Sequence, residues 1–130
     1  MLARHVRVAA KEDPRSGALA KAWGDVGRRF ARELEPHFRA EEEHLLPQLA
    51  AAGAQALAER ARKDHARLRE LVRGAPSVAA ATEFAERLHG HVRFEERELF
   101  PRAELVLSEA ELEAAGRAAL AARSAPSAPQ

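Results

Sequence analysis

The chain has 130 residues, with 21 Lys and Arg, 20 Asp and Glu, and no cysteine. This length suits a single domain, and the lack of thiols excludes disulfides and thiolate-bound metals, so any bound metal must be held by His, Asp and Glu. The charges are interspersed without a basic block, and no apolar run is long enough for a membrane span or a secretion signal, so we expect a cytoplasmic protein with no nucleic-acid or membrane partner.

Hydrophobic periodicity predicts five helices in chain order. Clusters of Pro and Gly separate the first four, and Ser108 with Glu111 forms a capping-box pattern that begins the fifth. Pro36 lies inside the second helix and should kink it just before His37, because proline lacks a backbone donor. The predicted helices span residues 2–13, 18–43, 54–73, 78–100 and 108–122.

Short connections between the first four helices favour an antiparallel up-down four-helix bundle. The fold class is therefore all-α, with a short extra C-terminal helix. We expect the bundle domain to occupy residues 1–122. Residues 123–130 are rich in Ser, Ala and Pro, which is typical of a disordered tail.

One pattern occurs twice in the chain, 54 residues apart. Each copy has a His, a Glu four residues later, a second adjacent Glu, and then two apolar residues followed by a proline. The first copy begins with His37 and Glu41, and the second with His91 and Glu95. Residues four apart lie on one face of a helix, so each copy directs an imidazole and a carboxylate the same way.

On a helical wheel these two pairs lie on the apolar stripes of their helices, not on the solvent faces. An unpaired carboxylate in an apolar core costs several kcal/mol, so the two Glu side chains require nearby cations. His5 on the first helix and His65 on the third bring further imidazoles. The pattern predicts two divalent metals bridged by two carboxylates, held by His5, His37, Glu41, His65, His91 and Glu95.

This order of His and Glu resembles that of the hemerythrin-like (HHE cation-binding) domain family, over about residues 2–103. The resemblance implies a four-helix bundle with a non-haem di-iron centre that binds O2, or acts on or senses O2, peroxide or nitric oxide. It also implies that Glu41 and Glu95 bridge two irons. By the same resemblance, the ligand pairs are His5 with His37 on one iron and His65 with His91 on the other.

The chain departs from the oxygen carriers of this family at one position. Carriers have a second His four residues after the one on the third helix, and here that position is Arg69. The centre then has four imidazoles instead of five, which leaves more exchangeable positions on the metals. This favours peroxide turnover, or a redox or oxygen-sensing role, over reversible O2 carriage.

Three further residues are candidates for orienting the ligands or for additional ligation: His44, Glu98 and Asp64. His44 lies seven residues after His37, Glu98 occupies the corresponding place in the second copy, and Asp64 lies beside His65 on an apolar face. We expect Glu42, Glu96 and His89 to point into solvent. We expect Trp23 to pack in the core.

Several functions stay open at this stage. The centre could make the protein an enzyme of weak peroxide-decomposing or nitric-oxide-handling activity, or a non-enzymatic iron or oxygen sensor whose fold depends on metal. A helical interaction module with vestigial His residues is a third alternative. Zinc or manganese could replace iron, because these donors do not discriminate among such metals. The sequence does not determine the oligomeric state.

Overall fold

The computed structural model describes residues 17–124, with side chains described through residue 117. The described chain is helical and contains no strand. It begins with one long helical run made of α2 (Ala18–Arg29), η2 (Phe30–Leu34), α3 (Glu35–Ala40), η3 (Glu41–Leu45) and α4 (Leu46–Ala51). After it come α5 (Gln55–Arg73), a second run made of α6 (Val78–Phe94), η4 (Glu95–Leu99) and α7 (Phe100–Val106), and finally α8 (Glu109–Ser124).

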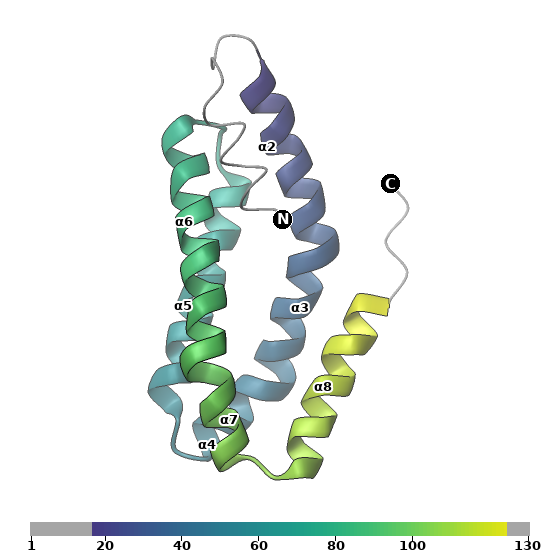
Figure 1. Ribbon diagram of the computed structural model, residues 1–130. Coiled ribbons are helices and arrows are strands. Elements are labelled where there is room, and N and C mark those ends of the chain that lie inside the picture. The colour runs from purple at the N-terminus through teal and green to yellow at the C-terminus, as the bar shows by residue number, and fades with distance from the viewer. Residues whose placement is uncertain (1–16, 125–130) are drawn as a thin grey trace.

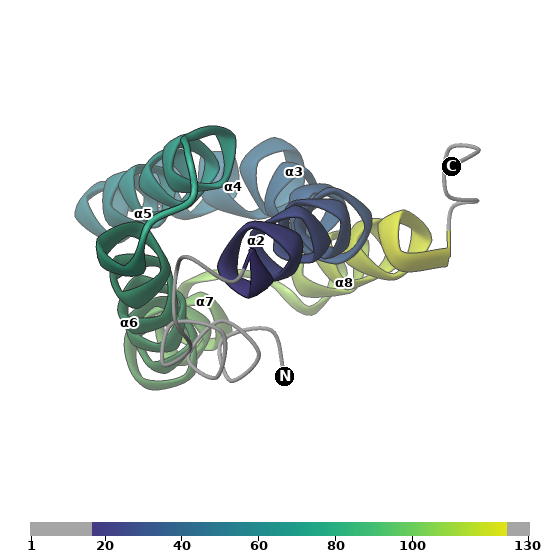
Figure 2. The same ribbon diagram turned by 90° about the horizontal axis from the view of Figure 1, so that it is seen from above.

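The helices lie alongside one another as a bundle (Figure 1). A tight turn at Gly53, whose φ of 93° suits glycine, lets α5 fold back onto α4. A second short connection, residues 74–77, joins α5 to α6, which pack against each other. In the view from above, α8 lies on the side of α3 away from α5 (Figure 2). The helix predicted over residues 2–13 lies outside the described residues.

Three π-helical segments interrupt the two long runs, and each ends two residues before a proline. The segments η2, η3 and η4 precede Pro36, Pro47 and Pro101. Proline cannot donate to the carbonyl four residues back, and its ring collides with that carbonyl, so a regular α-turn cannot close there. A π-turn widens the helix at this point. The kink expected before His37 therefore takes the form of a π-helical segment.

The same adjustment lets the helices continue past their prolines. The helix predicted over residues 18–43 reaches Ala51, and the one predicted over 78–100 reaches Val106. The last helix begins with the predicted capping box: the Ser108 hydroxyl accepts from the Glu111 N–H at 3.1 Å, and the Glu111 carboxylate accepts from the Ser108 N–H at 2.9 Å.

A polar layer divides the buried core into two apolar clusters. The layer consists of Glu41, His65, His91 and Glu95, all buried. The cluster on one side is built mainly from large side chains of α2, α3, α5 and α6, and that on the other from η3, α4, α6, η4 and α7. Their principal members are Trp23, Phe30, Phe38, Leu68 and Phe84 on the first side, and Leu45, Leu46, Leu49, Phe94 and Leu99 on the second.

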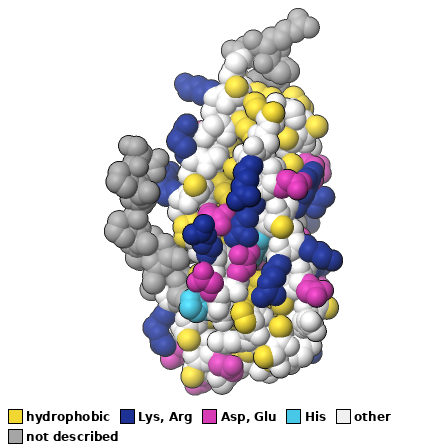
Figure 3. All heavy atoms as spheres, turned by 180° about the vertical axis from the view of Figure 1, so that it is seen from behind, with side chains coloured by type: hydrophobic (Ala, Val, Ile, Leu, Met, Phe, Trp, Pro, Cys, Tyr) yellow, Lys and Arg dark blue, Asp and Glu magenta, His cyan; other side chains and the backbone are white. Residues whose placement is uncertain are grey.

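The surface carries both signs of charge in close alternation. On the face shown in Figure 3, Lys and Arg side chains lie among Asp and Glu side chains without a block of one sign. Many form ion pairs, as Arg67 does with Glu83 at 2.7 Å. Among the described helices, none combines the length and apolar character that crossing a bilayer demands.

Candidate metal centre

Three helical runs deliver the residues of the polar layer and the half-buried His37 beside it. His37 and Glu41 come from α3 and the start of η3, His65 comes from the middle of α5, and His91 and Glu95 come from α6 and the start of η4. Each Glu lies one turn after its His, so both side chains of a pair face the bundle interior. The repeated pattern therefore supplies two walls of the centre, and α5 supplies a third.

Two groups of metal-capable atoms form within this layer. The ligand atoms of Glu41, His65 and His91 all lie within 4.8 Å of one another, and so do those of His37, Glu41 and Glu95. Glu41 belongs to both groups. Its Oε1 lies 3.2 Å from His65 Nε2, and its Oε2 lies 3.7 Å from His37 Nε2. The two oxygens of one carboxylate thus face imidazoles of different groups, as a bridging ligand requires.

The second carboxylate occupies a comparable place. Glu95 belongs to the group with His37 and Glu41, and its Oε1 lies 3.5 Å from His91 Nε2. The rings of His65 and His91 are neighbours, with centroids 4.9 Å apart. Among the described residues, the structure thus brings together five of the six predicted ligands. The sixth, His5, lies outside the described residues.

Carboxylates outside the centre hold the two fully buried imidazoles in place. Nδ1 of His65 lies 2.7 Å from Glu42 Oε2, and Nδ1 of His91 lies 2.9 Å from Asp64 Oδ2. An ionised carboxylate only accepts, so each Nδ1 carries the proton and each Nε2 presents its lone pair to the interior. A carboxylate behind an imidazole is the usual support of a metal-ligating His, because it fixes the tautomer and ring orientation.

Arg69 anchors one of these outer carboxylates. Its guanidinium donates to both oxygens of Glu42, at 2.9 and 3.0 Å, and to both oxygens of Glu35. Burial alone would raise the pKa of Glu42, but hydrogen bonds from Arg69 and His65 lower it below its ordinary value. Glu42 is therefore a carboxylate that accepts from His65 and does not compete for its proton.

Burial disfavours the charged forms of the ionisable side chains in the centre. Burial, followed by the adjacent carboxyl group of Glu41, raises the pKa of Glu95 to about 8. Burial likewise raises the pKa of Glu41 and lowers that of His65. These shifts indicate a site that resists carrying net negative charge unless a cation is present.

Five buried atoms of the layer make no hydrogen bond: both oxygens of Glu41, Oε2 of Glu95, and Nε2 of His65 and His91. Acceptors face acceptors across short distances here, since the lone pair of His65 Nε2 lies 3.2 Å from Glu41 Oε1. Two ligands bound to one divalent ion at about 2.1 Å lie about 3 Å apart when they occupy neighbouring positions. The residues present therefore fit divalent metal ions.

Two of the predicted supporting residues are not brought into this layer. His44 is exposed, with its ring 3.8 Å from the carboxylate of Glu43, and Glu98 is exposed and pairs with Arg60 at 3.2 Å. Both lie in π-helical segments. A π-turn holds more residues than an α-turn, so a spacing that suits one face of a regular helix leads here to a different face.

The two copies of the pattern also differ where the sequence suggested equivalence. Glu42 was expected in solvent but bonds to His65, whereas its counterpart Glu96 is exposed, as is His89. The corresponding support for His91 comes instead from Asp64, one of the predicted supporting residues. The one sequence signal for Glu42 was the unusual doubling of Glu after each His, and Arg69 had no signal beyond replacing a metal ligand.

Comparisons with known proteins agree with this geometry. The family model for the hemerythrin HHE cation-binding domain matches residues 1–103. No curated protein and no solved structure matches the chain. The matched residues include all six predicted ligands and cover most of the chain. This protein therefore belongs to the hemerythrin HHE cation-binding domain family.

Proposed function

We propose that the protein is a non-haem di-iron protein that binds or turns over O2, peroxide or nitric oxide at a carboxylate-bridged metal pair. One observation carries the proposal: Glu41 is shared by two groups of ligand atoms, and its two oxygens lie near imidazoles of different groups. The bundle would be antiparallel and up-down, completed by the helix predicted over residues 2–13.

The donor set supports iron over softer-ligand metals. It consists of imidazole nitrogens and carboxylate oxygens, and the chain has no cysteine. Glu41 and Glu95 would bridge the two irons, His65 and His91 would ligate one, and His37 would ligate the other. Zinc or manganese could occupy the same donors in purified protein.

His5 would complete the second iron site. A cavity of about 480 Å³ adjoins His37, His91 and Glu95 on one side of the centre. This cavity leaves room for a further imidazole and for a small ligand beside the metals. With four imidazoles in all, each metal keeps exchangeable positions, which binding of a small molecule requires.

The residues of the chain would act on such a ligand by position and charge. His65 and His91 are held by Glu42 and Asp64, so their Nε2 atoms do not turn away from the metals. When bound, a ferrous pair supplies the electrons or the binding positions for O2, peroxide or nitric oxide. Apolar clusters flank the centre on both sides along the bundle.

Metal analysis with optical spectroscopy tests this proposal. The freshly purified, iron-loaded chain should hold about two irons, show near-ultraviolet charge-transfer bands that shift with azide, and consume peroxide. Glu95→Ala should lose both irons, because the Glu95 carboxylate would contact both of them. The exposed control His89→Ala should retain both irons. Glu95→Ala should still fold, since it removes a buried carboxylate. If the folded variant retains two irons, the bridging assignment is wrong.

A metal-dependent sensor is the second candidate, favoured by the buried carboxylates and the raised pKa of Glu95. Those groups destabilise the metal-free bundle, so metal binding would be coupled to folding. Helical content and protease resistance should then fall sharply on iron removal. A metal-free form as resistant as the loaded form would exclude this role.

A further inference from the structure

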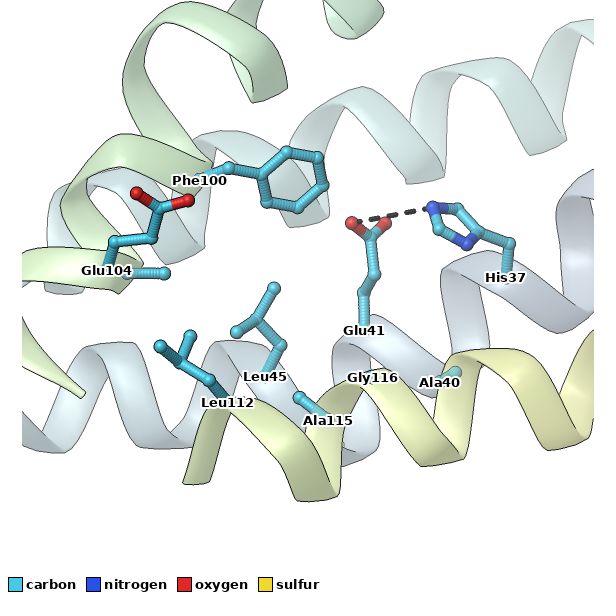
Figure 4. A pocket seen from close by; sticks show the side chains of 10 residues that line it. His37, Ala40, Glu41, Leu45, Phe100, Glu104, Leu112, Ala115 and Gly116 are labelled. Carbon is cyan, nitrogen blue, oxygen red and sulfur yellow. Dashed lines mark ion pairs between the residues drawn. The ribbon is translucent and has the colours of Figure 1, made fainter. Parts of the chain in front are cut away.

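A second cavity, of about 280 Å³, lies between η3, α7 and α8 and reaches the metal centre (Figure 4). His37 and Glu41 lie at one end, and Glu104 lies at the other (Figure 4). The wall between these ends is apolar. It is formed mainly by Leu45, Phe100, Ala103, Leu112 and Ala115.

The part of this wall that α8 provides lies outside the residues that the family model matches. The match ends at residue 103, and α8 begins at Glu109. The helix packs on α3 and η3, so Leu112, Ala115 and Gly116 line the cavity beside the predicted ligands His37 and Glu41. The shape of this space therefore depends on a helix that the family match does not cover.

The volume is far larger than the proposed small ligands need. It equals roughly nine water molecules at about 30 Å³ each, whereas O2, nitric oxide and hydrogen peroxide are hardly larger than one or two. A space of this size with apolar walls suits one small organic molecule. Burial of that molecule's apolar surface would provide the affinity.

The charged side chains known to line the cavity do not favour an anion. Among the described residues that line it, the ionisable ones are His37, Glu41 and Glu104, and none is Lys or Arg. In the metal-free chain, a carboxylate-bearing ligand would face two acidic side chains, and no described lining residue offers a guanidinium or ammonium to pair with it. An uncharged O–H group, in contrast, can donate to Glu41 or approach a metal beside it.

Resting on the proposed function, we propose that this cavity binds an uncharged, mainly apolar organic molecule with a single hydroperoxyl or hydroxyl head. The head lies at the end formed by His37 and Glu41, and the apolar body lies against α8. The chain would thereby take an organic hydroperoxide, or the alcohol of the same carbon skeleton, in preference to hydrogen peroxide.

Gly116 offers a direct test, because a Cβ built there meets no atom within 4 Å. Gly116 is exposed and lines the cavity, so Gly116→Leu should narrow the cavity from its α8 side. Gly116→Ala is the matched control for the gain in helix propensity, and Arg117→Leu places the same new side chain on an exposed position of α8. Ala115→Leu fills the cavity from the adjacent residue. Circular dichroism checks folding of each variant.

The metal-free chain separates this proposal from the di-iron proposal. Titration calorimetry with 2-phenylpropan-2-ol should show binding to the original chain, weakened at least tenfold in Gly116→Leu and Ala115→Leu. Binding to Gly116→Ala and Arg117→Leu should change less than about twofold. Circular dichroism first confirms that the metal-free chain is helical, and if it is not, the same titration uses the zinc-loaded chain. No binding to the folded original chain, or equal binding by the filled variants, overturns the cavity proposal, whatever the iron content and azide spectrum show.

The iron-loaded chain distinguishes a hydroperoxide ligand from an alcohol ligand. Reduction of cumene hydroperoxide would give 2-phenylpropan-2-ol and water, with two protons from solvent and two electrons from the ferrous pair of the proposed function. Consumption that is lost in Gly116→Leu, while hydrogen peroxide consumption persists, identifies the hydroperoxide as the ligand. Alcohol binding that follows the same variants without any consumption of cumene hydroperoxide identifies the alcohol.

Discussion

The imidazoles of His65 and His91 each have one nitrogen on a carboxylate and the other facing the centre of the bundle. The support for His65 extends further, because Arg69 holds Glu42 in turn. Arg69 occupies the position where oxygen carriers of this family place a metal ligand. In this chain that position would support the proposed ligand His65 through Glu42.

Glu42→Gln should weaken iron binding by about 10- to 100-fold, because the amide cannot replace the charge that orients His65. Glu96→Gln is the matched control, since Glu96 is the exposed counterpart of Glu42 in the second copy of the pattern. Competition with a chromogenic chelator measures both affinities. Equal affinities for the two variants would show that the Glu42 contact has no part in metal binding.

The stability of the metal-free chain should fall with rising pH. The pKa of Glu95 is about 8 in the folded state against an ordinary 4.5, so folding takes up a proton between these values. The stabilisation is complete below about pH 4.5 and is lost as pH rises through about 8. Between about pH 7 and about pH 8 the unfolding free energy should decrease by about 1 kcal/mol.

Urea denaturation of metal-free protein at these two pH values measures that change. His65, whose pKa burial lowers, acts in the opposite direction, but its unfolded value near 6.5 places its effect mostly below this window. Glu95→Gln should flatten the dependence. An unchanged slope in this variant would assign the titration to another group.

How far the residues of the site follow from sequence depends on whether they share a helix. His37 with Glu41, and His91 with Glu95, could be paired from spacing alone, because one helical turn separates each pair. Glu42 and Arg69 could not, since their contacts with His65 and Glu35 join different helices. Such contacts depend on the register between packed helices, which no spacing within one segment reveals.

Among the elements, the π-helical segments decide which residues reach the centre. η3 begins at Glu41 and η4 begins at Glu95, so both copies of the pattern pass directly from ligand to widened turn. Periodicity predicts the helices that the structure describes, including the capped α8. It does not predict that they continue past Pro47 and Pro101, because proline usually ends a helix, whereas here the wider π-turns accommodate it.

Ser108→Ala should loosen α8 without emptying the metal centre. The variant loses the hydroxyl that accepts from the Glu111 N–H, at a cost of about 1 kcal/mol to the helix. Amide hydrogen exchange should accelerate in residues 109–117, while iron content and the azide spectrum stay as in the original chain. Ser77→Ala, which removes the cap of α6, should accelerate exchange there instead, and a loss of iron in Ser108→Ala would contradict this separation.

For the whole molecule, iron should act as a strong stabiliser. Metal ions would convert a layer of facing acceptors and acidic groups into bonded contacts, and free iron at a hundredfold excess over its dissociation constant adds about 2.7 kcal/mol to the free energy of unfolding. Differential scanning calorimetry should show the unfolding temperature rising by roughly 10 °C on loading. Glu95→Ala should show no such rise.

The polar layer between the two apolar clusters also bears on how the bundle opens. Without ions, buried acceptors face one another in the layer between the two apolar clusters. Each end of the bundle can then fluctuate separately, and its amides can exchange as a separate unit. With ions, the ligands from three helical runs are tied at mid-length, and both ends must open together. In this chain, bound metal at the middle of the bundle would make unfolding cooperative.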